Sequence, residues 1–195
     1  MNASYSPLIS AEALISFQNP FVLLDTRAGA PVFAAGHLEG ALHADFNLQL
    51  SGAGEPGFDP AHGGRHPLPS PAAWAAQLGK WGFGADAYVV AYDDASGAAG
   101  ACRLWWMLRA FCHDRVAVLD GGLQAALKAG MTVTQTVPPV PMNVGPYPCQ
   151  GWQWPTSDLT EVERRLEDPN WKVLDVRSRE RWRGEIEPMD PVKGR

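Results

Sequence analysis

The sequence predicts an α/β protein built on a parallel sheet that helices cover on both faces. Short runs rich in β-branched and aromatic residues, YVVAY at 88–92 and VAVL at 116–119, are typical of buried strands. Helical segments separate these runs, and each run is followed by Asp and then by small residues. Strands that alternate with helices form parallel sheets, and ligands of such sheets bind beyond the carboxyl ends of the strands.

The first part of the chain predicts one helix, one strand and one long loop. Ser10 is a good N-cap for a helix, and Glu12 places an acid in its first turn, where it interacts favourably with the helix dipole. Residues 21–24 form the next expected element, a strand that ends at Asp25. The stretch 44–69 is rich in Gly, Pro and His and is expected to be a loop.

The middle of the chain alternates between helices and strands. Ser70 followed by Pro71 indicates a helix start, and Gly130 lies just past the end of the last helix. In chain order, the expected elements are a helix at 71–81, a strand at 88–92, a helix at 101–111, a strand at 116–119 and a helix at 123–129. The loops in which a ligand site is expected are 25–29, 93–100 and 120–122.

The character of the chain changes near Gly151. Residues 151–195 carry 9 of the 16 basic and 10 of the 21 acidic side chains, although they are less than a quarter of the chain. The stretch 132–155 is rich in Pro and has little periodicity, which predicts an extended, semi-rigid connector.

The C-terminal segment repeats the opening of the chain. Thr156 or Ser157 is expected to cap a charged helix, and a strand is expected to begin over Lys172–Leu174. Asp-x-Arg follows this strand as it follows the first one, and Asp25 and Asp175 are 150 positions apart. This order predicts a duplicated domain, although two short matches can also arise by chance.

The composition excludes several classes of function. A net charge of −5 provides no basic surface for nucleic acid or for an anionic membrane. No apolar run approaches the roughly 18 residues that a membrane span needs, and the opening MNASYSPLISAE shows no signal peptide. Three cysteines without paired spacing favour the reducing cytoplasm over a disulfide-stabilised secreted protein.

The cysteines are not arranged as nucleophiles. A reactive thiolate needs a helix N-terminus or a cradle of backbone amides. Cys102 lies inside an expected helix beside apolar residues, so we expect a buried structural thiol. None of the three cysteines has the Arg six positions later that a Cys-x5-Arg anion loop requires, and Cys112 and Cys149 lack metal-ligand spacing.

The acidic residues at the strand ends allow two interpretations. Asp25, Asp93 and Asp94 could gather at one edge of the sheet and bind Mg²⁺. We favour the alternative, in which Asp25 pairs with Arg27 and the other two carboxylates cap the loop after their strand.

The histidines and the C-terminal arginines also allow either a structural or a functional interpretation. His37, in GHLEGA, is expected to bond to nearby backbone rather than to act in catalysis, and His62 and His66 are expected to be exposed. An arginine-rich stretch near the end is either a solvated helix face or an anion site, because guanidinium groups suit oxyanions. Its members are Arg177, Arg179, Arg181 and Arg183.

Several stretches, in this order, resemble the first domain of the two-domain rhodanese-type sulfurtransferases, which include thiosulfate and 3-mercaptopyruvate sulfurtransferases. They are LLDTR with GHLEGALHADF, VVAYDDASGAAGACRLWWMLR and DRVAVLDGGLQAAL, and together they cover about residues 8–131. The final stretch VLDVRSRERWRGEIEPMDPVKGR resembles the opening of the second domain of that family.

This resemblance implies a rhodanese-like domain over 1–131 with a five-stranded parallel sheet flanked by helices, a connector over 132–155, and an incomplete second rhodanese-like domain over 156–195. The first domain of the family is catalytically silent and packs against the second. A cysteine of the second domain takes sulfane sulfur from a small anionic donor, becomes a persulfide, and passes the sulfur to cyanide or a thiol. The resemblance implies no metal, organic cofactor, nucleic acid or membrane.

The resemblance also assigns roles to individual residues. Asp93 stands where the active domain has its nucleophilic cysteine, and a carboxylate forms no persulfide. Arg181 resembles the arginine that grips the donor. The catalytic cysteine is expected beyond Arg195, so the chain as given is expected to be inactive, ended either by a trypsin-like protease or by a truncated reading frame. The alternative is a non-catalytic binding or regulatory module.

Overall fold

The computed structural model describes residues 6–59, 64–139 and 141–188. The chain divides into two compact units, Met1–Trp154 and Pro155–Arg195, and each is described by itself. The Pro-rich stretch, which the sequence predicts to be a connector, falls almost entirely in the first unit.

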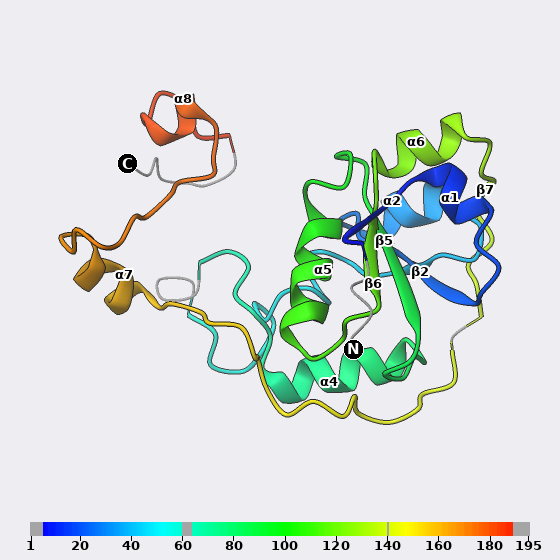
Figure 1. Cartoon of the computed structure of the whole chain (residues 1–195), viewed down its shortest axis with the longest axis horizontal. Coiled ribbons are helices and arrows are strands. Elements are labelled where there is room, and N and C mark those ends of the chain that lie inside the picture. Colours follow the sequence, from blue (N-terminus) through cyan, green and yellow to red (C-terminus); the bar gives the residue numbers. More distant parts are fainter. Residues whose placement is uncertain (1–5, 60–63, 140, 189–195) are drawn as a thin grey trace. The chain divides into compact units, whose positions relative to one another are not determined.

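The first unit is built on a five-stranded parallel sheet, as the sequence and its family resemblance predict (Figure 1). The strand order is β1-β6-β5-β2-β4, and every pairing in this sheet is parallel. The strands are β1 (Leu8–Ile9), β2 (Phe21–Asp25), β4 (Leu42–His43), β5 (Tyr88–Tyr92) and β6 (Val116–Leu119). Two further short strands, β3 (His37–Leu38) and β7 (Val133–Thr134), form an antiparallel pair beside it.

Helices cover both faces of the sheet, and each face has its own hydrophobic cluster (Figure 1). One cluster lies against α4 and α5, and the other against α1 and α6. The helices of this unit are α1 (Ala11–Ile15), α2 (Ala30–Ala35), α4 (Pro71–Lys80), α5 (Gly100–Ala110) and α6 (Gly122–Lys128).

The central strand β5 shows why the sequence folds this way. All five of its side chains are buried. Val89 and Ala91 belong to the cluster under α4 and α5, whereas Tyr88, Val90 and Tyr92 belong to the cluster under α1 and α6. Side chains of a strand alternate between its two faces, so a strand that is covered twice must be apolar throughout.

Residues 142–154, which we call the strap, pack across the helices of the first unit. The backbone N–H groups of Val144 and Tyr147 donate to carbonyl oxygens of α4, at 3.2 and 3.0 Å, and that of Gln153 donates to the last residue of α5 at 2.7 Å. The Trp152 ring stacks near Trp106 and Trp74. The strap is extended, as Pro-rich sequence requires, and it is docked along its length.

The second unit contains two short helices, α7 (Leu159–Arg165) and α8 (Arg179–Trp182). Asp158 caps α7 by accepting the N–H of Glu161 at 2.7 Å, so the expectation of a Thr156 or Ser157 cap was wrong.

The expected strand over Lys172–Leu174 is absent from the described residues of the second unit. The side chains of Leu174 and Val176 are 81% and 95% exposed. A strand is stabilised by hydrogen bonds to a neighbouring strand, and the described part of this unit supplies no such neighbour. Within the described ranges, no helix has the length and apolar character that would let it cross a membrane.

A close contact between α4 and the strap yields a test of the packing. Replacing Gly79 by Ala removes a helix-breaking residue, which by itself stabilises a helix by about 1 kcal/mol. The added Cβ, however, would overlap the Gly145 carbonyl group, whose carbon would lie at 2.7 Å. We expect Gly79→Ala to lower the free energy of unfolding in urea by about 1–3 kcal/mol, because the obstacle is backbone. Gly84→Ala, which has open space around it, is the control; equal stability of the two variants would contradict this packing.

Candidate functional site

The carboxyl edge of the sheet carries a buried ion pair that begins directly after β2. Arg27 donates from Nε to Asp25 Oδ1 at 3.0 Å and from Nη2 to Oδ2 at 2.6 Å. The Tyr92 hydroxyl donates to the same Oδ2 at 2.8 Å, and Arg27 also donates to the Gly36 carbonyl at 2.6 Å. The predicted pairing of Asp25 with Arg27 is confirmed.

The electrostatics of this network indicate a structural role. Burial and the neighbouring Asp25 carboxylate raise the pKa of Tyr92, so its hydroxyl stays protonated and keeps donating. The hydrogen bond to Asp25 raises the pKa of Arg27. Asp25 is fully buried and accepts from Arg27 and Tyr92 at once, which leaves little capacity for a substrate.

The loop after β5 forms a cradle of backbone amides around the carboxylate of Asp93. Oδ1 accepts the N–H groups of Ala95 and Gly97 at 2.9 and 2.7 Å, and Oδ2 accepts those of Ala99 and Ala101 at 3.0 and 3.1 Å. Asp93 is buried. Converging backbone N–H groups form an anion site, and here the anion is the protein's own side chain. Capping of this loop by Asp93 is therefore confirmed.

The cradle depends on an unusual backbone. Ser96 and Gly97 have φ angles of 60° and 85°, in the left-handed region. A Cβ at Gly97 would also lie 2.7 Å from the Val118 side chain, so the loop packs directly on β6. This curvature turns alternate N–H groups of the loop inward, where a single charged group can accept several of them.

The magnesium alternative is wrong for the described residues. No group of three His, Cys, Asp or Glu side chains within 6–59, 64–139 and 141–188 could hold a metal ion. The carboxylates of Asp25 and Asp93 are engaged by a guanidinium and by amides, respectively. Asp94 is exposed, and its carbonyl oxygen accepts a hydrogen bond from Gln124.

The cysteines differ from expectation in two ways. Cys102 is exposed rather than buried, because it lies on the face of α5 that points away from the sheet. Partial burial and the nearby Asp93 raise the pKa of its thiol, which disfavours the thiolate. Cys112 and Cys149, which the sequence gives no reason to pair, form a disulfide. No cysteine lies in the position that Asp93 occupies.

The histidines follow the sequence-based expectation in part. His37 is fully buried, and its Nδ1 lies 2.9 Å from the Phe33 carbonyl, as predicted for a residue bonded to nearby backbone. His66 is half-buried with its ring edge-on to Phe46, rather than exposed. His62 lies outside the described residues.

In the second unit, Asp175 and Arg177 repeat the geometry of the first ion pair. Arg177 donates from Nε at 3.0 Å, from Nη2 at 2.6 Å and from its backbone N–H at 2.9 Å. The hydrogen bond from the guanidinium lowers the pKa of Asp175 to about 2. Asp-x-Arg therefore forms the same local structure in both units.

Arg181 lies on α8 and forms a two-pronged ion pair. Its Nη2 lies 2.8 Å from Glu187 Oε1, and its Nε lies 3.2 Å from Oε2. The Glu187 side chain is buried and also lies 3.7 Å from Arg177. Arg183, by contrast, is exposed and lies near Glu185 at 3.6 Å. The family resemblance assigns the Arg181 guanidinium to binding of the sulfur donor. In this structure, the same guanidinium holds the Glu187 carboxylate.

The first unit lacks a counterpart of Arg181. Arg181 stands four positions after Arg177, and Pro31 stands four positions after Arg27. Pro31 lines an open hollow together with Arg27, Val32 and Gly36, so this position carries no cation in the first unit.

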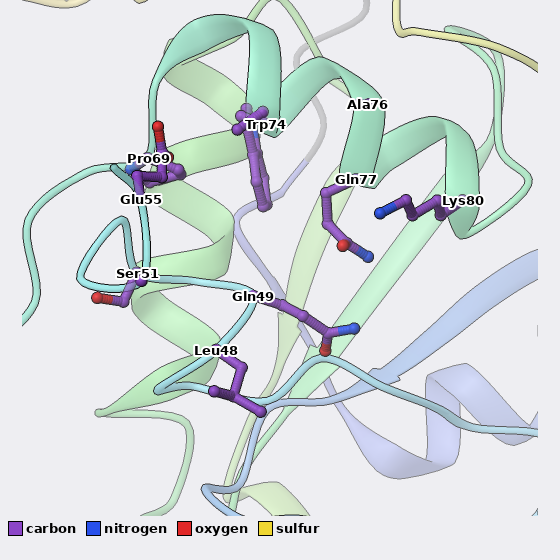
Figure 2. Close-up of a pocket in the computed structure, with 11 residues that line it drawn as sticks. Leu48, Gln49, Ser51, Glu55, Pro69, Trp74, Ala76, Gln77 and Lys80 are labelled. Carbon is purple, nitrogen blue, oxygen red and sulfur yellow. The ribbon is translucent and has the colours of Figure 1, made fainter. Parts of the chain in front are cut away.

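A second hollow, of about 310 Å³, lies between α4 and the loop at 48–55 (Figure 2). Gln77 and Lys80 from the helix and Gln49 from the loop converge on it, and Leu48 lies at its edge. The lining combines polar side chains (Gln49, Ser51, Gln77) with the charged groups of Glu55 and Lys80 and the apolar Trp74.

Comparisons with known proteins agree with the fold. The pattern described as the rhodanese-like domain matches residues 10–129. A Pseudomonas aeruginosa protein named "Probable 3-mercaptopyruvate sulfurtransferase" is 37% identical over 95% of this chain and 63% of its own length. The human 3-mercaptopyruvate sulfurtransferase is 33% identical over 83% of this chain and 52% of its own length.

Solved structures show the same architecture. SseA from Escherichia coli, a 3-mercaptopyruvate sulfotransferase with the rhodanese fold, superposes with a TM-score of 0.73 and 22% identity. The match covers 95% of this chain and 71% of SseA. The chain therefore spans 52% to 71% of the length of these three proteins.

The occupied cradle can be tested by removing its anion. Asp93→Ala leaves four amides without their acceptor, two of them in the buried residues Gly97 and Ala101, so we expect the free energy of unfolding to fall by about 2–4 kcal/mol. Asp94→Ala, at an exposed neighbouring carboxylate, should change it by less than about 0.5 kcal/mol. Urea unfolding of both variants measures the difference, and a value for Asp93→Ala close to that of Asp94→Ala would show that the carboxylate does not hold the loop.

Proposed function

Since the chain belongs to the rhodanese-like domain family, we propose that it is part of a sulfurtransferase that moves sulfane sulfur from thiosulfate or 3-mercaptopyruvate to cyanide or a thiol. The reaction has two covalent steps. A cysteine thiolate attacks the sulfane sulfur and the donor leaves, and the resulting persulfide then gives that sulfur to the acceptor. The observation that carries the proposal is the amide cradle after β5, which has the form of an anion site and is filled by Asp93.

The proposal assigns different tasks to different parts of the chain. Residues 1–131 are a catalytically silent rhodanese-like domain, 132–155 connect it to the next one, and 156–195 begin a second rhodanese-like domain. The repeated Asp-x-Arg geometry supports this division, because the same local structure follows the same pattern in both units. We also propose that the two domains pack against each other.

The nucleophilic cysteine belongs to the second domain, outside the 195 residues. In support, none of the three cysteines lies in an amide cradle, two of them are paired with each other, and the third has a raised pKa. By itself, the chain of 195 residues is therefore inactive in sulfur transfer. The reaction requires no metal or organic cofactor.

Arg181 binds the anionic end of the sulfur donor. Its present partner is the Glu187 carboxylate, held by two nitrogen atoms of the guanidinium. Anions that present two neighbouring oxygen atoms match this two-pronged arrangement, so the tetrahedral thiosulfate or a carboxylate of the donor can take the position of Glu187.

The proposed compartment is the cytoplasm, and the partners are small molecules. The structure removes one argument for the cytoplasm, because two of the three cysteines are paired and therefore no longer indicate a reducing environment.

A non-catalytic binding module is the second candidate. The observation in its favour is again the Asp93 carboxylate, which fills the cradle of the one domain that the chain contains in full. A module of this kind would bind a donor or a partner without turning it over.

Both candidates expect the 195-residue chain to be inactive, and they differ in the activity expected of the longer protein. With thiosulfate and cyanide, the 195-residue chain should form thiocyanate no faster than the uncatalysed reaction, while the Pseudomonas aeruginosa relative serves as the assay control. The sulfurtransferase proposal further requires that the gene continues past Arg195 into a cysteine-containing loop, and that the longer protein is active. Thiocyanate formation by the 195 residues alone would refute the placement of the nucleophile.

Donor binding by the second unit is tested by calorimetry with thiosulfate. Arg181→Gln should weaken binding at least about tenfold, because the loss of a charge-assisted bidentate contact is worth about 1.5–3 kcal/mol. Arg183→Gln, which changes an exposed arginine two positions after Arg181, should leave binding unchanged. Equal effects of the two substitutions would show that binding reflects net charge rather than the proposed site.

A further inference from the structure

The end of α5 carries a cysteine where backbone geometry favours glycine. Cys112 directly follows the last residues of the helix and has a φ of 65°, in the left-handed region. The N–H of His113 donates back to the Leu108 carbonyl at 2.9 Å, which closes the helix in the manner of a Schellman motif. Glycine is usual at this position because it lacks a Cβ, so the backbone gives no reason for cysteine here.

The partner of Cys112 supplies that reason. Cys149 lies 37 positions later, within the strap, and the two residues form a disulfide. The cross-link fixes the strap to the end of α5, a few residues before the second unit begins at Pro155. We propose that Cys112 and Cys149 are a reversible redox pair, whose thiol–disulfide exchange with dithiols tightens and loosens the strap. This proposal is independent of the sulfur-transfer reaction.

The strap has other contacts that hold it when the disulfide is open. Tyr147 is buried, and its hydroxyl lies 2.9 Å from His113 Nδ1. Its backbone N–H donates to the Ala75 carbonyl at 3.0 Å, and the Trp152 indole donates to the Pro69 carbonyl at 3.3 Å. Reduction therefore loosens the strap locally and leaves the first unit folded. A reversible switch requires that the disulfide can open while the rest of the unit stays folded.

The two cysteines differ in accessibility, which sets the order of the exchange. Cys112 is exposed, whereas Cys149 is buried. A thiolate of an external dithiol therefore attacks the sulfur of Cys112, the S–S bond breaks, and the Cys149 sulfur leaves and takes a proton. The second thiolate of the dithiol attacks the mixed disulfide and releases Cys112. Two electrons and two protons pass from the dithiol to the protein, and the dithiol becomes a cyclic disulfide.

The inference rests on the proposed function only through the proposed compartment, for which the disulfide itself is no support. Disulfides are rare in cytosolic proteins, and those that occur there are usually transient, catalytic or redox-sensing. A disulfide that only stabilised the fold would not be expected in that compartment. An exposed cysteine at a helix end suits repeated opening and closing.

The experiment is hydrogen exchange of the full 195-residue chain across a series of reduced to oxidised dithiothreitol. Intact mass follows the gain of two hydrogen atoms when the pair opens. The amides of Val144, Tyr147 and Gln153, which are hydrogen-bonded in the closed form, should exchange at least about tenfold faster in the reduced protein. The strands β5 and β6 should keep their protection in both forms.

Two variants separate the cross-link from its surroundings. Cys112→Gly removes the disulfide but suits the left-handed backbone, so it should show fast strap exchange at every dithiothreitol ratio while remaining folded. Cys149→Ser should show the same fast strap exchange as Cys112→Gly. Cys102→Ser, at the remaining free cysteine, should titrate like the unaltered protein.

Two outcomes would overturn the proposal. One is that the chain stays reduced at Cys112 and Cys149 in fully oxidised dithiothreitol. The other is that the disulfide opens and closes while the exchange of the strap amides stays the same. The first outcome would show that Cys112 and Cys149 are not a redox pair. The second would show that the pair does not control the strap. Neither outcome bears on the sulfurtransferase proposal, which the thiocyanate assay tests separately.

Discussion

One constraint governs the first unit: backbone N–H groups that converge on one point require a negatively charged acceptor at that point. The loop after β5 turns the N–H groups of Ala95, Gly97, Ala99 and Ala101 toward one point, and the Asp93 carboxylate accepts all of them. Buried amides without an acceptor are costly, so a loop of this shape requires an anion within reach. When the anion is a permanent side chain, the loop is stable without a ligand and cannot bind one. The stability of this loop and the catalytic silence that we propose for the domain thus have the same cause.

The ion pair after β2 shows how much of the site is local. Asp25 and Arg27 are buried under a folded sheet, whereas Asp175 and Arg177 lie in a unit without a described strand pairing. Both pairs nevertheless have nearly the same contacts, with Nη2 at 2.6 Å from a carboxylate oxygen. A carboxylate two positions before an arginine can close this arrangement from its own backbone turn. The burial of the first pair, by contrast, requires the rest of the domain.

This distinction also explains what the sequence could predict. Long, apolar elements such as β5 and α5 were visible from periodicity, and the Asp93 and Asp25 contacts follow from residues close in sequence. The six-residue α2 and the two-residue β4 are too short to produce a pattern. The strand expected over Lys172–Leu174 needs a partner strand, which local sequence does not supply. The exposure of Cys102 depends on how α5 is rotated, and the disulfide joins residues 37 positions apart.

The two units hold a carboxylate in different ways: Asp93 is held by backbone amides, and Glu187 is held by arginine side chains. Asp93 is buried and accepts four short-range backbone bonds, so an external anion would have to unfold the loop in order to replace it. Glu187 is held by side chains, mainly by Arg181, whose own side chain remains 18% exposed. Side chains can rotate away at modest cost, whereas a loop backbone cannot. This difference supports the proposal that a donor anion exchanges with Glu187 rather than with Asp93, and that the second unit receives the donor.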